Sequence, residues 1–359
     1  MLEKKRKLLA AFLFAAVGLM PVIIIFRILI VIKLIDPNTL LYEIGNPVPD
    51  IFNYVVCGLA AALLVCGLFF RMYFSPSRAP EPPADADPAD PYAPPVRRRG
   101  FWGRVEKGPL SRPLHTGSAL VFENRYASTV FASTVTGFIF IASAILIAGS
   151  YLLDSSGAAR SYEYGRAASS GMDVLNVVIL AAAILSGFYL LLSGMKKVDP
   201  YSGVFSFLSL APTVWCALRL VACYSDLSEN SNEYSHVLQI ACLVFITLFF
   251  FSEGRFTLAD PAGSSIALYV GSGLASLILI AAMSVPNLLL ASFWMVDFNA
   301  GVFNSLVEFF IAIYIVAKLT ALTRKLAKLP ESEVSFVRPK PAKKPKSKNG
   351  RDDAPDQAQ

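Results

Sequence analysis

Residues 264 to 283, SSIALYVGSGLASLILIAAM, form a run of 20 residues without a charged side chain. A helix rises about 1.5 Å per residue, so this run is long enough to cross a hydrocarbon core about 30 Å thick. Seven more stretches of the chain have the same apolar character. The eight predicted spans are 8–31, 51–70, 128–152, 174–195, 204–224, 234–251, 264–283 and 302–319. The sequence therefore predicts an all-α, polytopic helical membrane protein with about eight transmembrane helices.

The composition of the whole chain supports this fold class. Of the 359 residues, 55% are hydrophobic and only 16% are charged, and the mean hydropathy is +0.55. In soluble domains about a quarter of the residues are charged, so this composition does not fit a soluble enzyme. The net charge of +6 does not indicate a nucleic-acid partner, because the basic residues cluster beside apolar stretches. The predicted partner is the lipid bilayer.

The distribution of basic residues predicts the orientation. Cytoplasmic loops retain Lys and Arg, and an even number of spans with a cytoplasmic N-terminus places 27 of the 32 basic residues inside. Both termini are then cytoplasmic. The first span stays attached as an anchor, and we expect its Arg27 to extend to the outer interface. Leucine-rich spans without glycosylation acceptor sequences suit a bacterial plasma membrane.

The chain divides into four predicted parts. Residues 1–74 form a two-helix transmembrane unit, 75–127 a Pro-rich and basic cytoplasmic linker, 128–322 a six-helix core, and 323–359 a basic amphipathic extension followed by a disordered tail. The linker and tail are poor in aliphatic side chains and cannot fold around a core of their own. We therefore predict a two-helix unit joined to a six-helix bundle by a flexible spacer.

The linker contains a basic and aromatic cluster that could contact an anionic lipid headgroup or a cytoplasmic protein partner. A simpler interpretation is that it only retains the linker in the cytoplasm. The sequence leaves these alternatives open. The cluster consists of Arg97, Arg98, Arg99, Trp102 and Arg104, with Phe101 among them.

Two ionisable residues lie inside predicted spans. Arg219 is near the outer end of its span and Glu308 near the outer start of another, each roughly 7 to 9 Å below the surface. A charge at that depth needs a partner or a wet cavity, so we expect an ion pair that lines an outward-facing polar pocket. A pair that only joins two helices is the simpler alternative. The other candidates for the pocket are Asp173, His236, Gln239 and Asn304.

Other polar and small residues are better explained by structure. The small residues Ala267, Gly271 and Ala275 recur every four positions and predict close helix packing. The five cysteines lie in apolar stretches without metal-ligand spacing. The similar openings of spans 204–224 and 264–283, Asp-Pro each time, indicate either a parallel repeat or simply two good helix starts. We predict no metal and no cofactor.

Three classes of function follow, in order of preference. The first is a non-enzymatic scaffold or sensor whose cytoplasmic segments recruit lipid or protein. The second is a small-solute transporter or channel with an outward-facing pocket. An intramembrane enzyme comes last, because no nucleophile and base stand at a recognisable spacing. The sequence resembles no family closely enough to decide among these classes.

Overall fold

The computed structural model describes residues 2–34, 46–74, 121–122, 126–155, 174–195, 203–229, 235–258, 263–294 and 300–328. Within these ranges the chain is helical, and eight spans are long and apolar enough to cross a membrane. The predicted fold class is therefore confirmed. The helices are α1 (Leu2–Leu34), α2 (Val48–Phe74), α4 (Ala127–Ser155), α5 (Val174–Gly194), α6 (Gly203–Leu208), α7 (Ala211–Glu229), α8 (Ser235–Leu258), α9 (Gly263–Trp294) and α10 (Ala300–Lys328).

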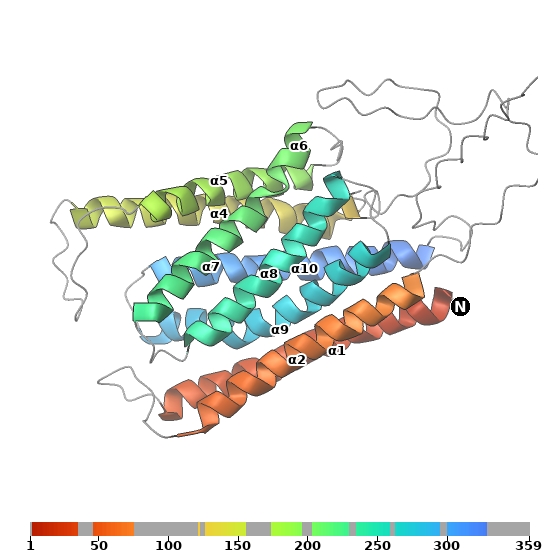
Figure 1. Ribbon diagram of the computed structural model, residues 1–359, viewed down its shortest axis with the longest axis horizontal. Helices are drawn as coiled ribbons and strands as arrows, with labels where there is room; N and C mark the ends of the chain where they lie inside the picture. Colours follow the sequence, from red (N-terminus) through yellow and green to blue (C-terminus); the bar gives the residue numbers. More distant parts are fainter. Residues whose placement is uncertain are drawn as a thin grey trace, which may run out of the picture.

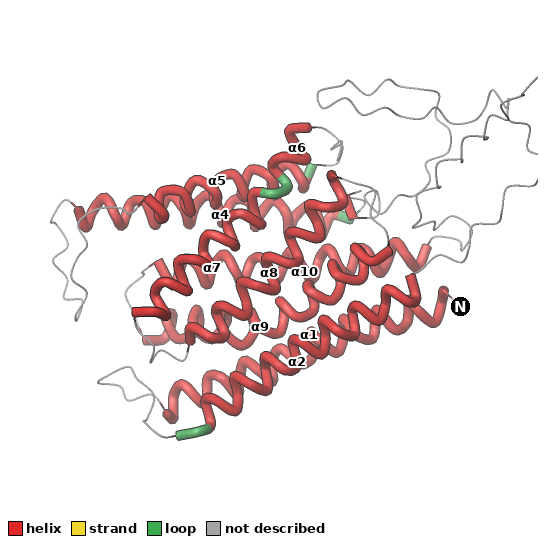
Figure 2. The backbone as a smooth tube through the Cα atoms, viewed as in Figure 1, coloured by secondary structure: helices red, strands yellow, loops and turns green. Residues whose placement is uncertain are grey.

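The long helices lie side by side as an elongated bundle (Figures 1 and 2). A helix satisfies its own backbone hydrogen bonds, which lipid cannot do for it, and this explains why the apolar stretches are helical. Helices α4 and α5 pack at one side of the bundle, α1 and α2 lie at the opposite side, and α7 to α10 fill the space between (Figure 1). Helix α9 contacts α1, α2, α8 and α10, and 94% of its span is buried.

Helix α2 meets α9 at two glycines. A Cβ atom on Gly67 would lie only 2.3 Å from the Gly271 Cα atom, and a Cβ on Gly271 would lie 2.9 Å from the Leu64 carbonyl oxygen. The two backbones are therefore in direct contact, as the small residues around Gly271 predicted. Any side chain at Gly67 has to push α2 away from α9. The predicted two-helix unit thus packs closely on the remaining helices.

A second close crossing joins α4 to α5. A Cβ atom on either Gly137 or Gly187 would lie 2.8 Å from the carbonyl oxygen of the other. The α4 helix also bonds to α10, because the Thr136 hydroxyl donates to the Phe310 carbonyl oxygen at 3.1 Å as well as to its own helix. In a bilayer the hydrophobic effect does not drive helices together, because lipid tails are as apolar as the side chains. Close backbone contacts and hydrogen bonds between helices hold them together instead.

The predicted span 204–224 is broken in the structure. Helix α6 ends at Leu208, a turn covers Ser209 and Leu210, and α7 begins at Ala211. Pro212 explains the break, because proline lacks the N–H that would continue the helix and its ring clashes with the carbonyl four residues earlier. Ser209 lies against Thr257 of α8, with 2.8 Å between the two hydroxyl oxygens. The turn keeps its backbone hydrogen bonds, from the Ser209 N–H to the Phe205 carbonyl oxygen at 2.9 Å and from the Leu210 N–H to the Phe207 carbonyl oxygen at 3.2 Å, as a segment without water around it requires.

Two sequence-based expectations need correction. Helix α8 continues to Leu258, beyond the predicted end of its span at Phe251, because Ser252, Gly254 and Thr257 pack into the bundle instead of forming a turn. Arg27, which we expected at the surface near the outer interface, is not exposed. Its side chain is buried, and its guanidinium lies 5.8 Å from the centre of the Phe52 ring on α2.

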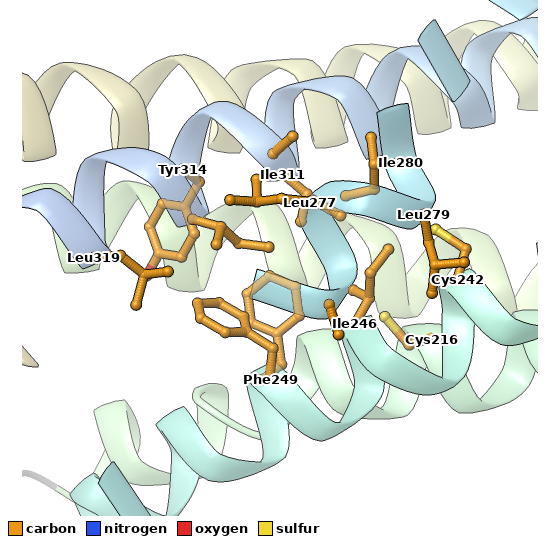
Figure 3. Close-up of a cluster of buried hydrophobic side chains, with 14 of the residues drawn as sticks. Cys216, Cys242, Ile246, Phe249, Leu277, Leu279, Ile280, Ile311, Tyr314 and Leu319 are labelled. Atoms are coloured by element: carbon orange, nitrogen blue, oxygen red, sulfur yellow. The ribbon is translucent and has the colours of Figure 1, made fainter. Parts of the chain in front are cut away.

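The centre of the bundle is apolar. Ile246 and Phe249 of α8, Leu277 of α9, and Ile311 and Ile315 of α10 are fully buried. Figure 3 shows this cluster, with Tyr314 and Leu319 at one end and Cys216 and Cys242 at the other. The layer separates two groups of buried polar side chains that lie toward opposite ends of the bundle.

Candidate functional site

The first polar group is an ion pair between α7 and α10. The Arg219 Nη1 atom donates to the Glu308 Oε1 atom at 2.7 Å. The hydroxyl of Ser284, on α9, donates to the other carboxylate oxygen, Oε2. Both carboxylate oxygens therefore have donors, and three helices meet at this pair.

Protein side chains enclose this pair. Arg219 is 4% exposed and Glu308 is 2% exposed, and the guanidinium lies 5.2 Å from the centre of the Trp215 ring. The thiols of Cys216 and Cys242 are fully buried close by. A buried pair of opposite charges with all its carboxylate oxygens bonded is tolerable in a low-dielectric interior, whereas a single charge is not.

Of the four predicted pocket residues whose side chains the structure describes, it brings Arg219 and Glu308 into contact. Asn304 and Gln239 are half-buried on α10 and α8, and neither forms a bond to the pair. His236 belongs to the first turn of α8, but its side chain lies outside the described residues, as does all of Asp173. The predicted polar pocket stays a prediction. The basic cluster, Arg97, Arg98, Arg99, Trp102 and Arg104, also lies outside the described residues.

The second polar group surrounds Glu253 of α8, a residue that the sequence did not single out. Its carboxylate is fully buried, and Oε1 accepts hydrogen bonds from the Tyr189 hydroxyl of α5, at 3.1 Å, and from the Tyr314 hydroxyl of α10. Tyr269 of α9 is within electrostatic range. We call Glu253, Tyr189, Tyr269, Tyr314 and Lys318 the Glu253 cluster.

Lys318 is the cation of the Glu253 cluster. It follows Tyr314 by one helical turn on α10, is 3% exposed, and interacts electrostatically with Glu253 without direct contact in the described structure. Its Nζ atom donates to the Val121 carbonyl oxygen at 3.4 Å and lies 5.5 Å from the centre of the Phe122 ring. Two linker residues therefore cover the lysine.

The broken helix completes this end of the bundle. Phe205 of α6 packs on Tyr189, with 5.4 Å between ring centres, and edge-on against Phe122, at 5.6 Å. A Cβ atom on Gly254 would lie 3.3 Å from the Ser209 carbonyl oxygen, so the turn between α6 and α7 rests on the residue next to Glu253.

The sequence missed this cluster because the predicted span ended at Phe251 and left Glu253 in a loop. One signal was available: Tyr189, Tyr269 and Tyr314 each lie within an apolar stretch, where a hydroxyl needs a polar partner. Among the described residues, no group of three or more His, Cys, Asp or Glu side chains could hold a metal ion.

These observations define the class: an integral membrane protein with eight helices, in the described ranges, that are long and apolar enough to cross the bilayer. It buries charged side chains at the Arg219–Glu308 pair and in the Glu253 cluster. The chain matches no protein-family model, no curated protein and no solved structure.

Proposed function

We propose that the protein is a non-enzymatic scaffold or sensor, a bundle that holds its linker and tail at the membrane surface. The observation that supports this proposal is the enclosure of the Arg219–Glu308 pair. Both oxygens of the carboxylate are engaged within the protein, and the two residues are 4% and 2% exposed. A solute that entered from outside would have to displace an aromatic ring and break a charged hydrogen bond.

This enclosure favours a structural role for the pair. An ion pair that binds a solute needs an approach from water, and a carboxylate that takes part needs a free oxygen at the surface of a pocket. The Arg219 guanidinium faces Trp215 on one side and Glu308 on another, and Ser284 uses the remaining carboxylate oxygen. The pair and the Ser284 hydroxyl link α7, α9 and α10.

Native cysteines allow a direct test, because Cys216 and Cys242 are fully buried close to the pair. The other three cysteines, half-buried Cys57 and Cys66 and buried Cys223, are replaced by alanine. A membrane-impermeant methanethiosulfonate reagent is then applied to the reconstituted protein. We expect no labelling of Cys216 or Cys242 until the protein is unfolded in detergent. Ser225→Cys, at an exposed position near the end of α7, is the positive control.

Labelling of Cys216 or Cys242 in the folded protein, at a rate comparable with Ser225→Cys, contradicts a sealed bundle. It would favour the second candidate, a small-solute transporter. The observation that favours a transporter is the break between α6 and α7 beside the buried Glu253, since discontinuous spans border many transport sites.

The recruiting part of the proposal rests on the sequence of the linker. We propose that both termini and the linker face the cytoplasm of a bacterial cell, at its plasma membrane, and that the basic cluster binds anionic headgroups or an acidic protein surface. The full chain in nanodiscs of anionic lipid is compared with the chain in zwitterionic lipid. We expect slower tryptic cleavage at Arg97, Arg98 and Arg99 in anionic lipid. Trp102→Ala with Arg104→Gln should remove part of the difference, and equal cleavage rates in both lipids contradict lipid binding.

A further inference from the structure

Glu253 and Tyr269 carry an unusual pair of buried atoms. The Glu253 Oε2 atom and the Tyr269 hydroxyl have no hydrogen-bond partner, although both residues are almost completely buried. Leaving a buried polar atom unpaired is costly, and more so for a charged group. Tyr189 and Tyr314 both donate to Oε1, so the Oε2 atom remains available to a hydrogen-bond donor that is not a side chain of the described residues.

Lys318 adds unused donors to the same cluster. An ammonium group has three N–H donors, and the structure gives Lys318 one hydrogen bond, to the Val121 carbonyl oxygen at 3.4 Å. Glu253 and Lys318 attract each other electrostatically but do not touch. A buried water molecule typically makes about three hydrogen bonds. The Glu253 Oε2 atom, the Tyr269 hydroxyl and the Lys318 ammonium are three groups that could form them.

We propose that Glu253, Tyr269 and Lys318 enclose a buried water site through which Glu253 takes up and releases a proton, with Phe122 as its cover. The proton passes from bulk water through the bound water to the Glu253 Oε2 atom, which forms the acid and leaves a neutral water molecule. This inference rests on the proposed function: if the protein is a sensor, Glu253 is the site at which it senses protons.

A bound metal cation is a weaker explanation of the same atoms. Sodium or potassium would need the Glu253 carboxylate, but the Lys318 ammonium already interacts electrostatically with that carboxylate and would repel a second positive charge there. A proton forms an O–H bond with the carboxylate and neutralises it, and it needs no shell of further oxygen ligands as a metal cation does. The groups that face Glu253 are Tyr189 from α5, Tyr269 from α9, and Tyr314 and Lys318 from α10.

The cover comes from the linker. Phe122 is 6% exposed, packs edge-on against Phe205 of the broken helix, and lies over Lys318. Val121, its neighbour, accepts the hydrogen bond of the lysine. A proton that reaches the site therefore changes the charge under two residues of the segment that we propose to recruit partners.

Infrared difference spectroscopy of the full chain in lipid tests the proposal. We expect a reversible carbonyl band of a protonated carboxylic acid when the bath is stepped from alkaline to acidic pH. Glu253→Gln should lose this band. Lys318→Met should keep it but move its half-point to higher pH, because a nearby ammonium favours the charged carboxylate. Phe122→Ala should make the band rise faster.

Three outcomes overturn the proposal: no band in the native protein, a band that survives in Glu253→Gln, or a band that depends on sodium or potassium at fixed pH. If Glu253→Gln does not fold, Lys318→Met decides, and an unmoved half-point overturns the proposal. If the core cysteines stay unlabelled but no infrared band appears, the scaffold proposal stands and the proton-sensing proposal is wrong. Labelled core cysteines contradict the scaffold itself, whatever the band shows.

Discussion

The Arg219–Glu308 pair gives the sharpest stability prediction. Arg219→Met leaves a buried carboxylate with only the Ser284 hydroxyl, and Glu308→Met leaves a buried guanidinium beside Trp215. Removing one partner of a buried pair costs about 3 to 5 kcal/mol. That change corresponds to about two to three and a half orders of magnitude in the unfolding equilibrium constant.

The double variant Arg219→Met/Glu308→Met should recover most of this loss, because it leaves no buried charge and replacing a whole pair by apolar residues is often neutral. The charge-swapped double variant, Arg219→Glu/Glu308→Arg, should recover part of it, limited by geometry around Ser284. The free energy of unfolding of all four variants is measured in mixed micelles by raising the fraction of a denaturing detergent. Arg255→Met, at an exposed position of α8, is the control and should change stability by less than about 0.5 kcal/mol.

Additive losses in the double variants would refute the reasoning, because they would mean that the two side chains act independently. Single variants with the stability of the Arg255→Met control would refute it as well, since a buried charge without its partner cannot be free of cost.

Three further predictions concern packing and orientation. Gly67→Ala should lower the unfolding midpoint, at a cost of about 1 to 3 kcal/mol for overpacking, whereas Gly58→Ala, where a Cβ meets no atom within 4 Å, should not. Thr136→Val removes the hydrogen bond from α4 to α10 and should cost about 1 kcal/mol, compared with little for Ser150→Ala, whose hydroxyl bonds only within its own helix. A phosphatase fused after Gln359 should be inactive and a fluorescent protein there should be bright, since each reports one side of the membrane; the reverse pattern contradicts cytoplasmic termini.

Local sequence properties determined how much could be predicted. Apolar length alone located the eight spans, because a bilayer imposes the same minimum length on each of them. The small residues around Gly271 indicated a close crossing, although the sequence could not name Gly67 as the partner. Arg219 and Glu308 stood out as charges inside spans, and their similar depth suggested that they meet.

The misses share one physical cause: composition does not show which polar residues the bundle encloses. Glu253 lies beside Arg255 near a helix end, and only the packing of Ser252, Gly254 and Thr257 against neighbouring helices draws it into the interior. The break before Ala211 was likewise hidden. Proline is common in the first turn of a helix, so Pro212 was as consistent with the start of a span as with an interruption.

The crossing of Gly67 and Gly271 has a consequence for biosynthesis. These two glycines are about 200 residues apart in the chain, and ribosomes add about 5 to 20 residues per second. The α2 face that receives α9 is therefore made roughly 10 to 40 s before its partner emerges, a delay that follows from the same rate of synthesis. During that interval an assembly factor or another membrane helix with small residues could occupy the face, so the order of insertion matters for this protein as much as the final contacts do.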